Sequence, residues 1–244
     1  MLLEFDLGNS RAKWRLLGAP PGELASGDFR IGPEGVIGTL ALPAQQLPIS
    51  RIRAGSVAGA QINEALTQLC RQWWNLVPEF AQSQAHCAGV SNGYQFPQRL
   101  GVDRWLALLA AYHRPDRQNR PCAVVDCGSA ITLDLLQADG KHLGGYIVPG
   151  LRMVSEVLSS RTRLIRIDEL PLGEISPGRV TDQAIGHGVM RMLHGLLDNL
   201  EEYLGSDYRL YFTGGDGERL LRSLKLPGSY HSDLVLDGLA WAVP

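Results

Sequence analysis

The sequence predicts an α/β fold made of two similar lobes, in each of which a mixed sheet is flanked by helices. Two repeated features lead to this prediction. Residues 6–10 (DLGNS) and 126–130 (DCGSA) each interrupt an apolar run that resumes shortly afterwards. A strand, a turn of small residues and a helix then follow in the same order in each half, at residues 51–74 and 209–225. A unit that recurs in the same order indicates an internal duplication.

The individual elements follow from the local pattern. Each Asp-x-Gly stretch is expected to join two antiparallel strands at a tight turn, because Gly accepts backbone conformations that other residues avoid. A hairpin is expected to turn at Asp139-Gly140, and residues 164–180, rich in Pro and Gly, predict a loop. The spacing of apolar residues predicts helices over residues 60–74, 104–113, 153–164, 182–205 and 218–225.

The polar, proline-bearing stretch at residues 113–121 predicts the boundary between the lobes. The N-terminal lobe is then expected to cover residues 1–115 and the C-terminal lobe residues 116–244. A chain of 244 residues is long enough for each lobe to bury a core of its own.

Composition and charge exclude several classes of function. The formal net charge is −2 and basic residues form no continuous stripe, so neither nucleic acid nor an anionic membrane is an expected partner. The four cysteines show no Cys-x-x-Cys or metal-finger spacing, which favours free thiols in a reducing compartment. No basic leader and no apolar run of about 18 residues is present, and we therefore expect a cytoplasmic protein.

The two Asp-x-Gly turns have the residue types that bind a polyphosphate. Backbone N–H groups in such turns grip phosphate oxygens, and the hydroxyls of Ser10 and Ser129 add further donors. Lys13 provides a positive charge, while Asp6 and Asp126 offer the hard carboxylate oxygens that Mg²⁺ prefers. We therefore interpret the turns as a phosphate-binding site that faces a cleft between the lobes.

Four segments in this order resemble a known family: DLGNSRAK at residues 6–13, YQFPQRLGVDRW at 94–105, DCGSAIT at 126–132 and GYIVPG at 145–150. The chain resembles the kinase superfamily that includes acetate and sugar kinases, actin and the heat-shock chaperones, and within it most resembles the type III pantothenate kinases. The resemblance implies two duplicated ribonuclease-H-like (actin-like ATPase) lobes. It also implies ATP-dependent phosphorylation of pantothenate to 4'-phosphopantothenate, the first step of coenzyme A biosynthesis.

The resemblance also implies roles for individual residues, and it implies a homodimer. Asp103 is the expected catalytic base, Asp126 the ligand of a monovalent cation (K⁺ or NH₄⁺), and Asp6 a candidate ligand of Mg²⁺. The residues expected to bind ATP are Asp6, Gly8, Asn9, Ser10, Lys13 and Ser129, with Gly214 and Gly215 on the adenosine side. The residues expected to bind pantothenate are Tyr94, Gly101, Val102, Asp103, Arg104 and Thr181, the last of them across the dimer interface.

Simpler interpretations stay open for several of these residues. Asp103 and Thr181 each stand where a helix N-cap is expected. Gly186 and Gly188, inside a predicted helix, indicate close packing either across a dimer interface or within one subunit. Two other functions also remain: a non-catalytic nucleotide-binding regulator, and another small-molecule kinase or a phosphohydrolase on the same fold.

Overall fold

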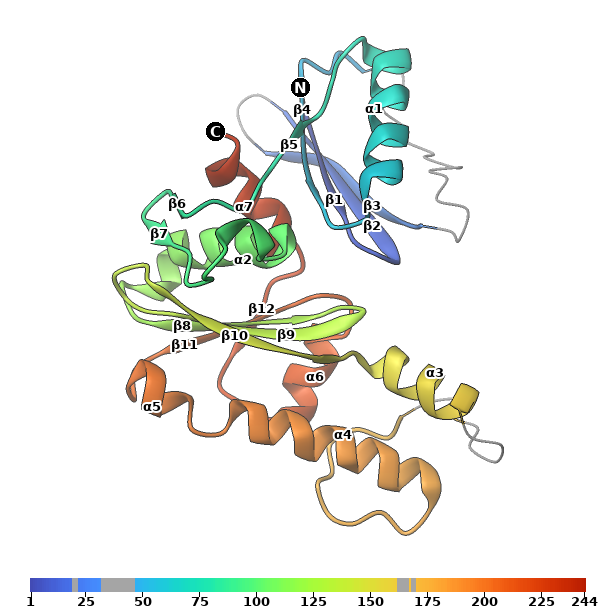
Figure 1. The fold of residues 1–244 in the computed structure, drawn as a ribbon, viewed down its shortest axis with the longest axis vertical. Helices are drawn as coiled ribbons and strands as arrows, with labels where there is room; N and C mark the ends of the chain where they lie inside the picture. Colours follow the sequence, from blue (N-terminus) through green and yellow to red (C-terminus); the bar gives the residue numbers. More distant parts are fainter. Residues whose placement is uncertain (19–21, 32–46, 162–166, 168–169) are drawn as a thin grey trace. The chain divides into compact units, whose positions relative to one another are not determined.

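The computed structural model describes residues 1–18, 22–31, 47–161, 167 and 170–244 (Figure 1). Contacts between Cα atoms divide the chain into two compact units, which are described separately. Unit 1 contains residues 1–88, 94–110 and 234–244, and unit 2 contains residues 89–93 and 111–233. In the predicted loop at 164–180, residues 164–166 and 168–169 lie outside the described part, and residues 170–180 form neither helix nor strand.

The sheet of unit 1 has the strand order β3-β2-β1-β4-β5. β1 pairs with β2 in antiparallel fashion and with β4 in parallel. The strands are β1 (Leu2–Leu7), β2 (Arg11–Leu17), β3 (Glu23–Arg30), β4 (Arg51–Ser56) and β5 (Glu79–Phe80). The helices of this part of the chain are α1 (Ala60–Trp74), the short 3-10 helix Pro97–Arg99, α2 (Val102–His113) and α7 (Leu234–Ala242), and a short strand, β6, covers His86–Cys87. α1 closes the core through Ile62, Leu66 and Cys70, one apolar stripe at helical spacing.

The sheet of unit 2 has the order β10-β9-β8-β11-β12. Its strands are β8 (Cys122–Cys127), β9 (Ala130–Leu136), β10 (His142–Pro149), β11 (Arg209–Thr213) and β12 (Ser229–Tyr230), and the short strand β7 covers Val90–Ser91. Its helices are α3 (Leu151–Arg161), α4 (Thr181–Leu197), α5 (Leu200–Leu204) and α6 (Gly217–Leu224), with a 3-10 turn at Pro115–Arg117. Figure 1 shows α4 and α6 on the same face of this sheet.

The two sheets repeat one topology. β8 pairs antiparallel with β9 and parallel with β11, as β1 pairs with β2 and β4. A central strand, a hairpin partner and a parallel neighbour therefore occur in the same arrangement in both units. The predicted fold class, two duplicated lobes with mixed sheets flanked by helices, is confirmed.

One predicted helix is wrong in its continuity. The expected helix over 182–205 is divided into α4 and α5 at Asp198 and Asn199. Asn199 has φ 63°, in the left-handed region that Asn tolerates better than most residues, and this conformation ends one helix before the next begins.

The two glycines of α4 differ in their packing within this subunit. Position 186 requires glycine, because a Cβ there would lie 2.2 Å from the carbonyl oxygen of Pro171. Gly188 has no such neighbour within 4 Å.

A buried ion network connects α7 to the sheet of unit 1. Glu4 is fully buried, and its carboxylate accepts hydrogen bonds from Arg15 and Arg53 at 2.5 to 3.0 Å. Arg15 also donates to Asp237 of α7, and Arg53 donates to the carbonyl of Val243. Because a buried charge is costly unless it is paired and hydrogen-bonded, these contacts account for the packing of the C-terminal residues in unit 1.

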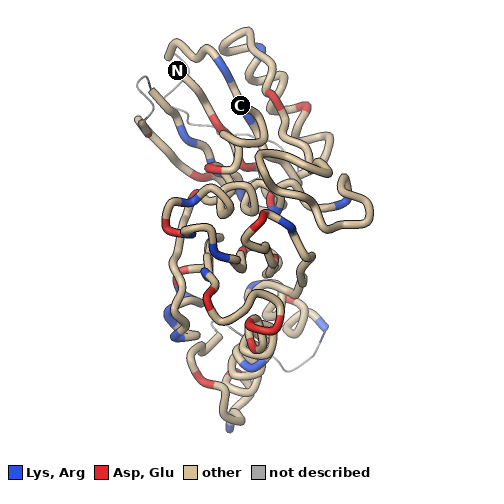
Figure 2. The backbone as a smooth tube through the Cα atoms, turned by 90° about the vertical axis from the view of Figure 1, so that its left-hand side faces the viewer, with Lys and Arg blue, Asp and Glu red and all other residues tan. Residues whose placement is uncertain are grey.

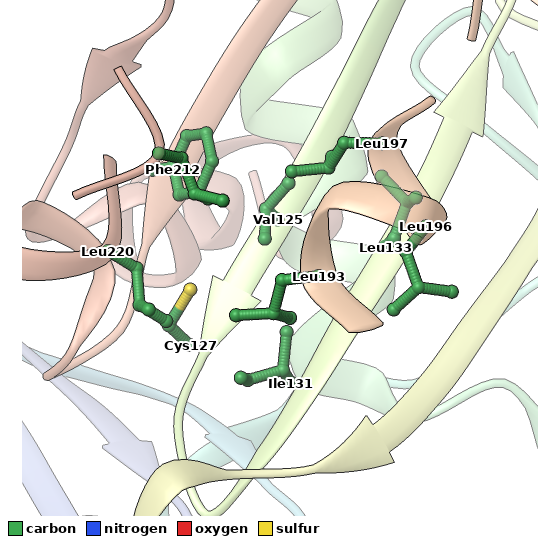
Figure 3. Close-up of a pocket in the computed structure, with 10 residues that line it drawn as sticks. Val125, Cys127, Ile131, Leu133, Leu193, Leu196, Leu197, Phe212 and Leu220 are labelled. Carbon is green, nitrogen blue, oxygen red and sulfur yellow. The ribbon is translucent and has the colours of Figure 1, made fainter. Parts of the chain in front are cut away.

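The core of unit 2 contains a small void between its sheet and α4 (Figure 3). Its volume is about 10 Å³ and its lining is entirely apolar, so it is a dry packing defect and no ligand site. Burial raises the pKa of the Cys122 thiol to about 12, and burial likewise raises the pKa of Cys127, which lines the void. The lining residues are Val125, Cys127, Ile131, Leu133, Leu193, Leu196, Leu197, Phe212, Leu220 and Leu224.

Charged residues are interspersed along both units (Figure 2). In the part of the chain that the structure describes, acidic and basic positions are mixed along the traced backbone. Among the described helices, none combines the length and the apolar character that a membrane crossing requires.

Candidate active site

The turn between β1 and β2 places an acidic and a basic residue side by side. The Gly8 N–H donates to the Arg11 carbonyl at 2.9 Å, and a Cβ at Gly8 would lie only 2.9 Å from the same oxygen. Glycine is therefore the residue that closes this turn. Asp6 is paired with Lys13 across the two strands, and side chains at such opposed positions are close neighbours.

The turn between β8 and β9 is also closed by a glycine N–H, but it is one residue shorter and has a different charge. The Gly128 N–H donates to the Ala130 carbonyl at 3.0 Å, and Gly128 and Ser129 are both exposed. Asp126 stands at the position that Asp6 occupies in unit 1, but the residue opposite it on β9 is Thr132. The second turn thus has a hydroxyl where the first has an ammonium group.

The turn after β11 packs directly on Asp126. Gly214 has φ +84°, and a Cβ there would lie 2.5 Å from the Asp126 carboxylate and 2.6 Å from the carbonyl oxygen of Cys127. The Asp216 N–H donates to the same Cys127 carbonyl at 3.0 Å. Gly214, predicted to bind ATP, and Asp126, predicted to bind a monovalent cation, lie more than 80 positions apart in the sequence (214 − 126 = 88) and are neighbours in space.

Two helices of unit 2 begin beside this pair of turns. The Gly150 N–H donates to the Ser129 carbonyl at 3.1 Å, and a Cβ at Gly150 would lie 2.4 Å from that oxygen. α3 starts at the next residue, and α6 starts directly after Asp216. Helix N-termini present unsatisfied backbone N–H groups and a positive partial charge, which favours anions at this end of the sheet.

A pocket of about 440 Å³ adjoins these helix starts. Asp216, directly before α6, and Arg219 of α6 line it, and the Arg219 guanidinium donates to the Leu170 carbonyl at 3.0 Å. The lining is mixed, with apolar and polar side chains in similar share, which suits a ligand that has both a flat apolar face and hydrogen-bonding edges. The other lining residues are Leu151, Arg152, Ser155, Glu156, Ser159, Ile167 and Leu170.

The start of α2 gathers the residues predicted to bind pantothenate in unit 1. The Asp103 carboxylate accepts the backbone N–H of Arg104 at 2.8 Å. Arg104 is only 5% exposed, and its guanidinium donates to the Tyr94 hydroxyl at 2.6 Å. The guanidinium carbon lies 5.4 Å from the centre of the Tyr94 ring. A Cβ at Gly101 would lie 2.6 Å from the Asp103 carboxylate, so glycine leaves room for this arrangement. Val102, 9% exposed, packs in the core.

The N-cap interpretations of Asp103 and Thr181 are both wrong. α2 begins at Val102, so Asp103 is its second residue and Gly101 precedes it, accepting the Trp105 N–H at 3.0 Å. α4 begins at Thr181 itself, after Val180, and no side chain caps it by a hydrogen bond. Thr181 is exposed at the start of its helix in unit 2.

Sequence reasoning missed the pocket residues Asp216 and Arg219. The only sequence signal for them was an Asp directly before a helical pattern, and such an Asp is usually interpreted as a helix N-cap.

Among the described residues no three His, Cys, Asp or Glu side chains form a cluster that could hold a metal ion. A divalent cation at Asp6 or Asp126 would therefore need most of its ligands from water and a phosphorylated ligand, which is the way Mg²⁺ is commonly held.

Two comparisons of the sequence with known proteins point to one family. A family model described as type III pantothenate kinase matches residues 2–202. The type III pantothenate kinase of Pseudomonas aeruginosa (strain LESB58) is 38% identical over 252 residues, covering 100% of this chain and 99% of its own.

Two solved structures share the fold. One, described as a Baf family transcriptional activator from Campylobacter jejuni, has a TM-score of 0.62 at 23% identity and covers 98% of this chain and 95% of its own. The other is the activator of the 2-hydroxyisocaproyl-CoA dehydratase from Clostridium difficile, with a TM-score of 0.52 at 10% identity, covering 98% and 91%. At these identities the likeness is one of fold alone.

Proposed function

Since the chain belongs to the type III pantothenate kinase family, we propose that it transfers the γ-phosphoryl group of ATP to the primary hydroxyl of pantothenate. The product is 4'-phosphopantothenate, and the reaction opens coenzyme A biosynthesis. The observation that supports the acceptor side best is the cluster of Tyr94, Asp103 and Arg104 at the start of α2. It combines a carboxylate with a buried guanidinium, the groups that an alcohol bearing a carboxylate requires.

We assign the acceptor residues as follows. Asp103 takes the proton of the attacking hydroxyl while its other contact, the Arg104 N–H, fixes its orientation. Arg104 pairs with the pantothenate carboxylate. Tyr94, whose hydroxyl accepts a hydrogen bond from the Arg104 guanidinium, lies beside that pair. Gly101 and Val102 shape the backbone here, and Thr181 adds a further contact.

The donor residues lie in both units. Gly8, Asn9, Ser10 and Lys13 bind ATP phosphates from unit 1, and Ser129 does so from unit 2. Gly214 and Gly215 let the nucleoside approach the backbone, and the neighbouring pocket at Asp216 and Arg219 accommodates its base. Phosphoryl transfer is catalysed mainly by positioning and by charge stabilisation, and these donors provide both.

At the γ-phosphorus the reaction forms one bond and breaks one, and a proton transfer accompanies them. The pantothenate hydroxyl oxygen bonds to the γ-phosphorus as its proton passes to Asp103, and the bond from that phosphorus to the β–γ bridging oxygen breaks, leaving ADP. Lys13 stabilises negative charge on the transferring group.

We propose two cation sites. Asp6 fits a ligand of Mg²⁺, because one carboxylate plus nucleotide phosphates is the usual set for that ion. Asp126 fits a ligand of K⁺ or NH₄⁺, because the residue opposite it is Thr132, whose uncharged hydroxyl stands where unit 1 has a lysine. Bound cations would neutralise phosphate charge during the transfer.

We further propose a homodimer in which Thr181 contacts the pantothenate bound by the other subunit. Thr181 suits that role because it is exposed at the end of a helix and no side-chain hydrogen bond caps that end. Analytical ultracentrifugation of the purified chain tests the dimer, and a monomer at assay concentrations would remove this part of the proposal.

A coupled assay of ADP release with pantothenate, in the presence and absence of K⁺, tests the reaction. We expect pantothenate-dependent turnover that K⁺ or NH₄⁺ increases and that Na⁺ does not. Asp103→Asn is expected to lower kcat by about 10²- to 10⁴-fold while ATP binding is retained. Nucleotide binding without turnover on any alcohol would instead indicate a regulator, and turnover on a different alcohol or on water would indicate another enzyme of this fold.

A further inference from the structure

Unit 2 contains a buried acid–histidine pair that the proposed reaction does not use. The side chains of His142 and Asp134 are 0% and 2% exposed, and His142 Nε2 lies 2.9 Å from Asp134 Oδ1. Polar groups this deeply buried are kept only where their hydrogen bonds are satisfied. Apolar side chains could replace a buried pair that served only to join β9 and β10. The contact of the second ring nitrogen of His142 therefore indicates what else the pair does.

The second nitrogen of His142 accepts a hydrogen bond from a neighbouring segment. The backbone N–H of Gly93 points at Nδ1 from 3.3 Å. A nitrogen that accepts from an N–H carries no proton itself, so the proton of the neutral ring is assigned to Nε2, which donates it to Asp134. Asp134 thereby selects the tautomer that His142 needs in order to hold Gly93, an arrangement known for histidines whose second nitrogen is fixed by a carboxylate.

The backbone around Gly93 is fitted closely to the same place. A Cβ at Gly93 would lie 2.0 Å from the His142 carbonyl oxygen, so no other residue allows this approach. The Ser91 N–H donates to the Gly140 carbonyl at 2.9 Å, and Ser91 forms an isolated parallel bridge with Lys141. Residues 89–93 are thus attached along the start of β10 by backbone hydrogen bonds and by one histidine.

The geometry of β10 is adapted to this contact. The pairing of β9 and β10 shifts register between His142 and Gly144, and Gly144 has φ +105°. Such bulges redirect a side chain at a chosen point of a strand. His142 is paired with Leu136, two residues along the strand from Asp134, so the imidazole and the carboxylate share one face of the sheet.

Tyr94 follows Gly93 directly in the chain, and Tyr94 receives the hydrogen bond from Arg104 in the proposed pantothenate site. We propose that Asp134 and His142 are positioning residues for pantothenate binding: they fix the backbone one residue before Tyr94 and so restrict where its ring and hydroxyl stand. This inference rests on the proposed assignment of Tyr94 and Arg104 to the acceptor site. It predicts an effect on pantothenate and none on ATP.

Two substitutions at position 142 separate the contacts of the ring. The amide oxygen of His142→Asn stands two bonds from Cβ, as Nδ1 does, and can accept from Gly93. The amide nitrogen of His142→Gln stands three bonds from Cβ, as Nε2 does, and can donate to Asp134 but cannot reach Gly93 in place of Nδ1. Loss of one backbone hydrogen bond is expected to raise KM for pantothenate by about three- to tenfold in the Gln variant. The Asn variant is expected to stay closer to wild type, although its Tm falls because the Asp134 carboxylate loses its donor.

Equal KM values for pantothenate in wild type and the Gln variant would overturn the proposal, and so would a parallel rise in the KM values for pantothenate and ATP. If either variant fails to fold, ¹⁵N-histidine NMR of the unmodified full chain tests the two hydrogen bonds of the His142 ring on which the proposal depends. We expect a proton on Nε2 and none on Nδ1 of His142, together with slow hydrogen exchange at the Gly93 amide. The opposite tautomer or an unprotected Gly93 amide would refute the arrangement. These two measurements need no turnover, so they fail separately from the proposed function.

Discussion

Substitution of Gly101 by Ala tests whether the position of the Asp103 carboxylate determines the rate. The new Cβ would lie 2.6 Å from Asp103 Oδ1, whereas an ordinary contact begins near 3.4 Å. The carboxylate must therefore move by about 0.8 Å (3.4 − 2.6), which also breaks its hydrogen bond from the Arg104 N–H. A misplacement of about 1 Å costs on the order of 10²-fold in rate, which corresponds to about 2.7 kcal/mol of transition-state stabilisation.

The expected result is a fall in kcat of about 10²-fold with little change in KM for ATP, measured by coupled ADP release. Ala at the position before α2 also weakens the helix start, by about 1 kcal/mol. Gly101→Ser carries the same Cβ but is a favoured N-cap, so its stability should recover while its kcat stays low. Gly195→Ala, a helical site with no atom within 4 Å of the new Cβ, is the control for a glycine substitution elsewhere. A Gly101→Ala enzyme with kcat within threefold of wild type would refute the role of this geometry.

Three further outcomes are expected from the packing and the buried charges. Gly186→Ala should lower the free energy of unfolding by at least about 1 kcal/mol, because its Cβ would meet a backbone carbonyl at 2.2 Å, whereas Gly188→Ala should raise it by about 0.5 to 1 kcal/mol in urea unfolding; the reverse order would contradict the packing described here. Glu4→Gln should cost about 3 kcal/mol or more, since the buried Arg53 guanidinium loses its carboxylate partner and Arg15 keeps only Asp237. Glu79→Gln, on an exposed pair, should cost less than about 1 kcal/mol, and equal losses would be evidence against the network. Burial raises the pKa of the Cys70 thiol from 9.0 to about 12, so this thiol ionises at lower pH in the unfolded chain than in the folded one. The free energy of unfolding should therefore fall by about 1.4 kcal/mol per pH unit above pH 9. In Cys70→Ala this fall should be shallower between pH 9 and 11, and an unchanged slope would argue against the raised pKa.

Local sequence patterns predicted those parts of the fold that depend on neighbouring residues. The two Asp-x-Gly turns and the helix after residue 59 were predictable because glycine geometry and apolar spacing act over a few positions. The break at Asn199 was not, because the apolar pattern continues across it and only the packed helices favour the left-handed residue. The return of α7 to unit 1 depends on the pairing of Asp237 with Arg15, more than 200 residues away (237 − 15 = 222), and no local signal specifies that contact.

The candidate site divides in the same way. Asp103 and Arg104 are adjacent in the sequence, so their association was predictable, and Tyr94 lies only ten residues before Arg104. Gly214 approaches Asp126 from the turn directly after β11, and the parallel register of β11 and β8 that brings them together is decided by the sheet as a whole. Sequence analysis proposed both residues from the resemblance of their motifs, but the reason that position 214 must be glycine became visible only from the oxygen atoms that surround it.

The two duplicated turns differ in the charge of the residue that faces their aspartate across the strands. Both turns place an Asp at the end of a central strand and close through a glycine N–H, so the backbone donors available to a phosphate are alike. They differ at the cross-strand position, where Asp6 meets Lys13 and Asp126 meets Thr132. An ammonium group opposite the first carboxylate opposes its negative charge, whereas the hydroxyl opposite the second carries no charge, so the first turn is the more favourable neighbour of a phosphoryl group. On electrostatic grounds, the exchange of lysine for threonine therefore favours an anionic ligand more strongly at the first turn than at the second.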